Sequence, residues 1–182
     1  KLEEFEYPNS LGLLYTAVTE FLGFKPNSDE WRVMALSSFY LKKKNKYYSI
    51  LKNKVIKIDK NGEFNIDLSF FNGYFPLKPN LYSKKFVKHF GIPRKNSDTI
   101  TRRHKQIAQA FQRVIEEVIF LKIKYLSKKY KEKNFCLSGG IFMNCLMNGK
   151  IEKNFRNLNF FIPFAPDDSG NSIGAALYLK KN

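Results

Sequence analysis

The nine residues Cys-Leu-Ser-Gly-Gly-Ile-Phe-Met-Asn at positions 136–144 carry the strongest structural signal in the chain. Residues 135–137 predict a short buried strand that runs into Gly139 and Gly140, and a helix is expected to follow. Glycine lets a backbone approach a phosphate closely, and the free N–H groups that begin a helix attract anions. A plain turn from strand to helix could use the same glycines, but Asn144, a polar residue in an apolar helix, favours a binding site.

A second signal of this kind lies near the end of the sequence. A strand is predicted at 158–162, and a helix with the small residues Gly-Ala-Ala at 174–176 is predicted over about 170–180. Asp167 and Asp168 lie between the two. An acid at such a strand end can bind a hard cation or cap the helix, and capping is favoured when this stretch is taken alone.

Upstream of these signals, hydrophobic spacing predicts helices and one hairpin. A helix is predicted over residues 10–22, with Ser10 as its cap and Gly23 after its end, and a long helix over about 99–131, capped by Asp98 or Thr99. The other expectations are strands at 55–58 and 64–68 around a turn at 59–62, helix or strand at 31–41, and mainly loop at 72–97.

The composition is that of a globular protein. The chain has 182 residues, 43% of them hydrophobic, and no apolar run approaches the ~20 residues of a membrane span. We expect no membrane partner. Because the first residue is Lys1 and not Met, we expect the chain to be a piece of a longer protein. Cys136 and Cys145 are expected to be buried packing residues in a reducing, cytoplasmic compartment.

The charge of the chain is strongly positive but does not by itself indicate nucleic-acid binding. The net charge is +16, and the Lys and Arg together number 32, of which only six are Arg. Proteins that read bases and phosphates usually rely on the planar fork of Arg. The many Lys, Asn, Phe, Ile and Tyr residues are those that AT-rich codons favour, so we interpret most lysines as solvated surface and expect nucleic acid to be an unlikely partner.

No catalytic residue can be assigned from the sequence. His89 and His104 are the two histidines, and each is expected to lie apart from any metal or catalytic site. No pairing of a serine or cysteine nucleophile with a histidine can be argued from the spacing.

Short blocks follow one another in an order that is more specific than any one of them. They are Asn-Ser-Leu-Gly-Leu-Leu-Tyr at 9–15, a stretch at 19–24 ending Leu-Gly-Phe, Glu-Trp-Arg-Val-Met-Ala-Leu at 30–36, Ile107-Ala108, Gln112, Ser138-Gly139-Gly140 with Asn144, and Asp168-Ser169-Gly170 with 174–176. Over nearly the whole chain this order resembles the O-carbamoyltransferase family of nodulation and antibiotic-tailoring enzymes.

The resemblance implies an α/β fold of the actin-like ATPase (ASKHA, ribonuclease H-like) class. Residues 1–182 would be the C-terminal part of the transferase domain, without its upstream half and without the YrdC-like domain of the usual enzyme. The implied reaction passes the carbamoyl group of carbamoyl-adenylate, which is made from carbamoyl phosphate and ATP, to the hydroxyl group of a small molecule. The implied adenylate-binding residues are Ser138, Gly139, Gly140, Asn144 and Gly170, and Asp168 is the implied ligand of a bound iron.

The chain also departs from the family pattern. The family's two metal-binding histidines precede the matched region, residues 34–40 read Met-Ala-Leu-Ser-Ser-Phe-Tyr in place of Met-Gly-Leu-Ala-Pro-Tyr-Gly, and Gln106 replaces a common Asp. A diverged or inactive member is therefore one reading. The alternatives are a relative of the tRNA threonylcarbamoyl transferases, against which residues 30–36 argue, and a non-catalytic, basic nucleic-acid-binding module.

Overall fold

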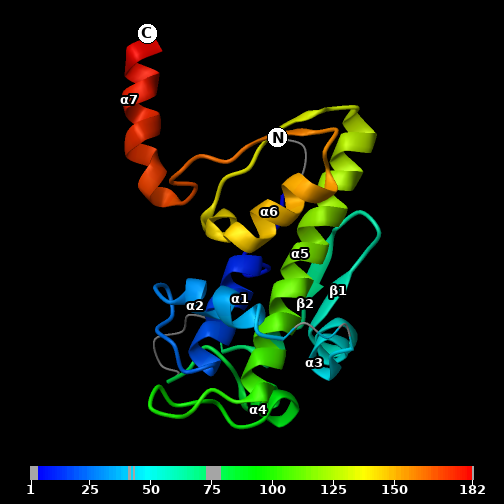
Figure 1. Cartoon of the computed structure of the whole chain (residues 1–182), viewed down its shortest axis with the longest axis vertical. Helices are drawn as coiled ribbons and strands as arrows, with labels where there is room; N and C mark the ends of the chain where they lie inside the picture. The colour runs from blue at the N-terminus through cyan, green and yellow to red at the C-terminus, as the bar shows by residue number, and fades with distance from the viewer. Residues whose placement is uncertain (1–3, 41, 43, 73–78, 182) are drawn as a thin grey trace. The chain divides into compact units, whose positions relative to one another are not determined.

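The computed structural model describes residues 4–40, 42, 44–72 and 79–181, and it divides into two compact units, residues 1–123 and 124–182 (Figure 1). The first unit contains α1 (Leu11–Phe21), α2 (Glu30–Ser37), α3 (Lys46–Ile50), the π-helical turn η1 (Leu51–Val55), β1 (Ile56–Ile58), β2 (Phe64–Ile66), the 3-10 turn η2 (Leu68–Phe70), α4 (Lys84–Phe90) and most of α5 (Arg102–Tyr130). Helices predominate in this unit and one two-stranded hairpin lies between them, so the chain is a mixed helix and sheet protein, as the expected α/β class requires.

The long helix α5 supplies the central apolar surface of the first unit. Ile107, Phe111 and Val114 recur at helical spacing and are fully buried, as the sequence predicted. The predicted caps were wrong, because α5 begins at Arg102. The carboxylate of Asp98 instead accepts a hydrogen bond from the backbone N–H of Lys95 at 2.9 Å, within the preceding loop.

Helix α1 agrees closely with its prediction. The Ser10 hydroxyl accepts a hydrogen bond from the N–H of Leu13 at 3.3 Å, which satisfies one of the free donors of the first turn. Leu14, Val18 and Phe21 are buried on one face of the helix. Gly23 follows with φ +73°, and the Arg94 carbonyl lies where a Cβ would be, so the position requires glycine.

Strands β1 and β2 form the predicted hairpin, although each is shorter than expected. They pair antiparallel, with Ile56 opposite Ile66 and Ile58 opposite Phe64. The Asp59 carboxylate accepts from the backbone N–H groups of Asn61 and Glu63, both at 2.8 Å, which closes the turn. The turn packs on α5, beside which Figure 1 shows the hairpin.

Three helices of the first unit, α2, α3 and α4, were not assigned from sequence. Residues 31–37 belong to α2, so the ambiguity at 31–41 is settled in favour of helix there, whereas residues 38–40 are not helical and residue 41 lies outside the described residues. The prediction of mainly loop at 72–97 was wrong where α4 lies, and its residues 73–78 lie outside the described residues. Ser83 caps α4, and Phe86 and Phe90 stack at 4.3 Å between ring centroids and are buried. Two helical turns between glycines and prolines give too short a periodic signal to detect.

The second unit begins in the last turns of α5 and contains a parallel pair of strands. Its other elements are β3 (Asn134–Cys136), the 3-10 turn η3 (Gly140–Met143), α6 (Cys145–Asn154), β4 (Asn159–Phe161), the 3-10 turn η4 (Asp168–Gly170) and α7 (Asn171–Lys181). β3 pairs with β4, with Phe135 opposite Phe160, and the rings of these two residues lie 5.7 Å apart. Both predicted strands and the last predicted helix are therefore confirmed, but the predicted burial of the first strand was wrong, because two of the three residues of β3 are exposed.

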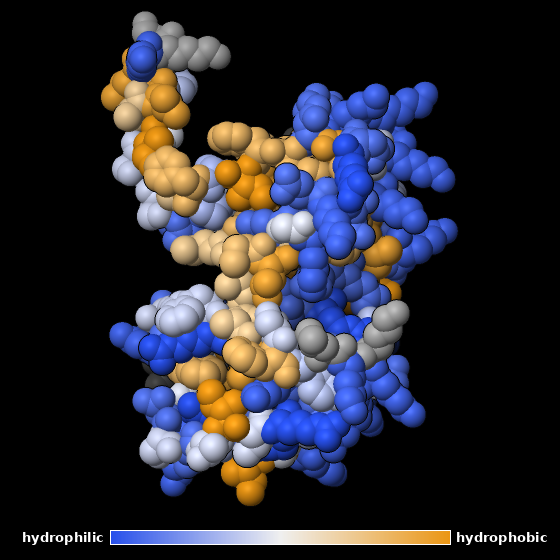
Figure 2. Space-filling model, in the orientation of Figure 1, coloured by the Kyte–Doolittle hydropathy of each residue, from blue (hydrophilic) through white to orange (hydrophobic). Residues whose placement is uncertain are grey.

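Apolar surface is exposed in the second unit. The side chains of Leu177, Tyr178 and Leu179 in α7 are 63%, 71% and 76% exposed, and Figure 2 shows hydrophobic residues around this helix. Cys136 and Cys145 are also exposed, so their predicted burial was wrong. Residues of β3 alternate between its faces, and Cys136 shares the exposed face with Asn134. Within the described residues, no helix is both long enough and apolar enough to cross a bilayer.

Gly62 offers a test of how the hairpin packs on α5. It has φ +80°, and an added Cβ would meet the Val118 carbonyl at 2.9 Å and the Lys122 N–H nitrogen at 2.6 Å. We expect Gly62→Ala to lower the free energy of unfolding by about 1–3 kcal/mol, because both the backbone conformation and the contact resist a side chain. Gly12→Ala is the control: Gly12 lies within α1, and we expect this change to raise stability by up to about 1 kcal/mol. Equal unfolding midpoints in urea for the two variants would contradict this packing.

His104 lies buried near the start of α5 between hydrogen-bond donors. Its Nδ1 accepts from the N–H of Thr101 at 3.0 Å, and a guanidinium nitrogen of Arg103 lies 3.0 Å from its Nε2. Burial lowers the pKa of His104, and the positive charges of Arg103 and Arg94 lower it further. The neutral ring is therefore the form that the folded chain stabilises.

This lowered pKa predicts the direction of a pH effect on stability. The unfolded chain takes up a proton on His104 as pH falls through about 6.5, whereas the folded chain resists it. The stabilisation is therefore fully present above about pH 6.5 and is lost as pH falls towards the lowered folded-state pKa. We expect the melting temperature of the wild type to fall more between neutral pH and about pH 5 than that of His104→Gln. An equal fall in both proteins would contradict the assignment.

Candidate functional site

Two loops meet beyond the carboxyl ends of β3 and β4. We call residues 138–140 the glycine loop and residues 163–170 the acidic loop. Because the strands are parallel, their carboxyl ends lie at the same edge. The pairing continues beyond the strands: the Leu137 N–H donates to the Phe161 carbonyl at 2.9 Å, and the Gly139 N–H donates to the Pro166 carbonyl at 2.5 Å. The glycine loop and the acidic loop are thus joined directly. In α/β proteins, ligands commonly bind beyond the carboxyl ends of parallel strands.

The backbone of the glycine loop is accessible. Ser138, Gly139 and Gly140 are all exposed. Gly139 has φ +105°, a conformation that residues with a side chain rarely adopt, so the turn requires glycine there. A Cβ built on Gly139 or on Gly140 meets no atom within 4 Å. The requirement at Gly139 is therefore conformational, whereas Gly140 leaves open space beside the chain.

Asn144 has a structural role, which the sequence alone could not distinguish from a role in ligand binding. It was expected inside a helix, but a 3-10 turn follows the glycines and α6 begins only at Cys145. The buried Asn144 side chain caps α6 by accepting from the N–H of Met147 at 3.0 Å. Capping explains a polar residue at this position without a ligand.

The two aspartates that follow β4 are not equivalent. Asp167 accepts from the Ser169 hydroxyl at 2.5 Å, and although it holds the cap position of η4, its carboxylate makes no capping bond to a backbone N–H. Asp168 is exposed, and among the described residues its carboxylate has neither an ion pair nor a hydrogen bond. The capping role that the sequence favoured for these acids is therefore not found, and Asp168 is open to a ligand.

Gly170 shapes the acidic loop. Its N–H donates to the Asp167 carbonyl at 3.0 Å, and a Cβ at this position would collide with the Ala165 carbonyl oxygen. The absence of a side chain lets the loop fold back on itself just before α7. Gly170 thereby helps to position Asp168.

Asn148 lies beside the candidate site and was not identified from the sequence. Its side-chain amide donates to the Phe142 carbonyl at 2.7 Å and so braces η3, the turn that follows the glycine loop. Its Oδ1 is buried and has no partner among the described residues. The one signal that could have identified it is its position one helical turn after Asn144, on the same face of α6.

The described residues do not complete a metal site. No group of three or more His, Cys, Asp or Glu side chains among them could hold an ion. Asp168 can supply one oxygen ligand, but both ring nitrogens of His104 face donors from Thr101 and Arg103 in the other unit. The expected iron therefore does not fit this set of residues by itself.

Comparison with known proteins identifies the family. The family description "Carbamoyltransferase N-terminus" matches residues 2–177. The chain belongs to the carbamoyltransferase family. This confirms the resemblance that the ordered sequence blocks indicated.

Individual relatives of this carbamoyltransferase-family chain are distant but are matched along nearly all of it. It is 33% identical over 175 residues to the uncharacterized protein sll1178 of Synechocystis, covering 96% of the chain and 28% of that protein. It is 27% identical over 183 residues to the nodulation protein NolNO of Sinorhizobium fredii, covering 98% and 24%. The nodulation protein NolO of Bradyrhizobium diazoefficiens is 27% identical over 184 residues, covering 98% and 30%. The chain thus spans less than a third of the length of these relatives.

Proposed function

We propose that this chain forms part of an enzyme that transfers a carbamoyl group from carbamoyl-adenylate to the hydroxyl group of a small molecule. The observation that carries the proposal is the hydrogen bond between Gly139 and Pro166, which joins an open glycine loop to the loop of the exposed Asp168 in a member of the carbamoyltransferase family. Carbamoyl phosphate and ATP are the proposed precursors of the adenylate.

The proposed reaction requires mainly that the protein hold the acceptor hydroxyl and the carbamoyl-adenylate in position. The acceptor oxygen forms a bond to the carbamoyl carbon, the bond from that carbon to the phosphate oxygen breaks, and AMP leaves as the hydroxyl proton is released. AMP is a good leaving group, so binding and orientation of the two reactants supply much of the rate. We assign the adenylate to the accessible backbone of Ser138, Gly139 and Gly140, with Asn144 and Gly170 shaping the loops on either side.

The metal is a narrower part of the proposal. We propose that Asp168 contributes one carboxylate ligand to an iron ion whose other ligands lie outside the described residues. A carboxylate that is exposed and makes no internal bond loses no existing interaction when it binds a cation. When bound, a divalent metal orients reactants and stabilises developing negative charge.

The fold class is a further part of the proposal. We propose that residues 1–182 are a partial actin-like (ASKHA) domain of the cytoplasmic enzyme. The parallel β3–β4 pair, joined through α6, supports this assignment, because doubly covered sheets of parallel strands are built from such units.

A pair of glycines tests the adenylate site. Gly140 and Gly149 are both exposed, and a Cβ on either meets no atom within 4 Å, so neither position resists a side chain sterically. In a protein that carries this sequence at the full length of its relatives, we expect Gly140→Val to weaken AMP binding at least about tenfold by occupying ligand space. Gly149→Val, within α6, should bind AMP as the wild type does. Calorimetric titration with AMP measures both, and equal affinities would refute the adenylate assignment.

A pair of aspartates tests the metal ligand. In the same full-length protein we expect Asp168→Asn to lose most of its bound iron, because an amide is a much weaker ligand than a carboxylate. Asp167→Asn is the control, since Asp167 is already engaged by Ser169, and it should keep its iron. Metal content is measured by mass spectrometry, and circular dichroism checks that both variants fold. Unchanged iron in Asp168→Asn would exclude this ligand.

A further inference from the structure

The net positive charge of the first unit arises from two segments of the sequence. Residues 31–58 and 99–115 contain twelve Lys or Arg and no Asp or Glu. The other residues of this unit contain ten Lys or Arg against twelve Asp or Glu. The entire net positive charge of the unit therefore comes from the two acid-free segments. Codon usage acts on the whole chain and does not account for this placement.

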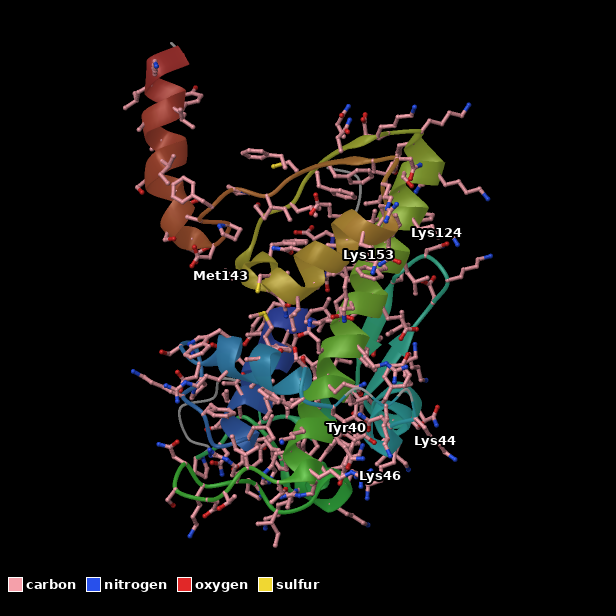
Figure 3. The ribbon with its side chains drawn as sticks, viewed as in Figure 1. Tyr40, Lys44, Lys46, Lys124, Met143 and Lys153 are labelled. Atoms are coloured by element: carbon pink, nitrogen blue, oxygen red, sulfur yellow. The ribbon has the colours of Figure 1, made fainter. Side chains whose placement is uncertain are left out.

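The fold brings the two acid-free segments together. The Asn45 side chain donates to the Gln106 carbonyl at 2.7 Å and to the Gln109 side chain at 2.6 Å, and Gln109 donates to the Lys42 carbonyl at 3.2 Å. The segment around α3 is thereby held along the first half of α5. Figure 3 shows Tyr40, Lys44 and Lys46 in this part of the unit.

Six cations line this junction, and we call them the basic face. They are Lys42, Lys44, Lys46, Arg102, Lys105 and Arg113. Lys42, Lys44, Lys46 and Arg102 are exposed.

Aromatic rings hold the cations that α5 contributes. The guanidinium carbon of Arg113 lies 3.9 Å from the centroid of the Tyr48 ring, and the Lys105 ammonium lies 5.5 Å from the Phe39 ring. The Phe39 side chain is 70% exposed, so one face of an aromatic ring is accessible beside the charges. The arrangement combines fixed positive charge with a stacking surface.

The chemistry of the basic face fits phosphates better than a protein surface. Protein interfaces are depleted in lysine and have apolar centres, whereas nucleic-acid interfaces are much more polar and positive. Residues 102–113 extend over about 17 Å at the rise of an α-helix, so the cations of the basic face are spread along a strip of about that length. The face can therefore contact several phosphates, and an exposed ring such as Phe39 stacks on unpaired bases.

We propose that the basic face binds the phosphate backbone of single-stranded nucleic acid without regard to sequence. The proposal goes beyond carbamoyl transfer and is independent of it, because the face lies wholly within the first unit, while the glycine and acidic loops belong to the second. Binding is therefore measured without ATP, carbamoyl phosphate or iron, and failure of either proposal leaves the other standing.

The test compares two triple variants that remove the same charge from a protein that carries this sequence at the full length of its relatives. Lys42→Gln, Lys44→Gln and Lys46→Gln together remove half of the basic face. Lys25→Gln, Lys60→Gln and Lys95→Gln form the control, because these three exposed lysines lie outside both acid-free segments. Fluorescence anisotropy of a labelled oligouridylate of about 20 nucleotides is followed across a salt titration. Circular dichroism checks that each variant is folded.

We expect the wild type to bind with a steep dependence on salt. The basic-face triple variant should bind at least about tenfold more weakly near 0.1 M salt, and its slope of log affinity against log salt should be smaller by about 2. The control should stay within about twofold of the wild type. Equal losses in both variants, or no binding by the wild type, would overturn the proposal. Displacement of the RNA by polyglutamate of equal charge would also overturn it and point to an acidic protein.

Discussion

Parallel pairing of β3 with β4 is the interaction on which the candidate site depends. Antiparallel pairing would place the glycine loop and the acidic loop at opposite edges of the sheet. The parallel register instead continues past the last strand residues, through the bonds from Leu137 to Phe161 and from Gly139 to Pro166. Two signals separated by some thirty residues of sequence thereby become one local structure.

A buried polar chain plays the corresponding part in the first unit. The Tyr15 hydroxyl of α1 donates to the Gln112 side chain of α5 at 3.0 Å, and Gln112 donates to the Glu116 carboxylate at 2.8 Å. Burial, with the charge of Glu116, raises the pKa of Tyr15, which keeps the phenol protonated and able to donate. Apolar contacts alone would let α1 slide along α5, whereas these bonds favour one register.

The sequence predicted the long elements well because their signals are local. The stripe of Ile107, Phe111 and Val114 and the cap at Ser10 each depend on residues within a few turns. Helix α4 was missed because only two turns of periodicity lie between Gly and Pro residues. The cysteines were placed wrongly because apolar neighbours in sequence do not show which face of a strand (Cys136) or of a helix (Cys145) meets solvent.

The sequence singled out most residues of the candidate site but did not show the structural role of each. The order of short blocks indicated the family, and the two loops that carry it do meet. What sequence could not show is that Asn144 caps α6, that Asp167 is engaged by Ser169, or that Asp168 is left open. These distinctions depend on side-chain directions, which follow from the precise end of each helix.

The hydrogen bond from Gly139 to Pro166 has a thermodynamic consequence. Because this hydrogen bond joins the two loops, any ligand that shifts the glycine loop also changes the conformational equilibrium of the acidic loop. Occupancy of either loop then alters the affinity of the other, and the two effects are equal in size, since coupling between binding sites is reciprocal. We therefore expect the proposed adenylate and metal sites to bind their ligands cooperatively.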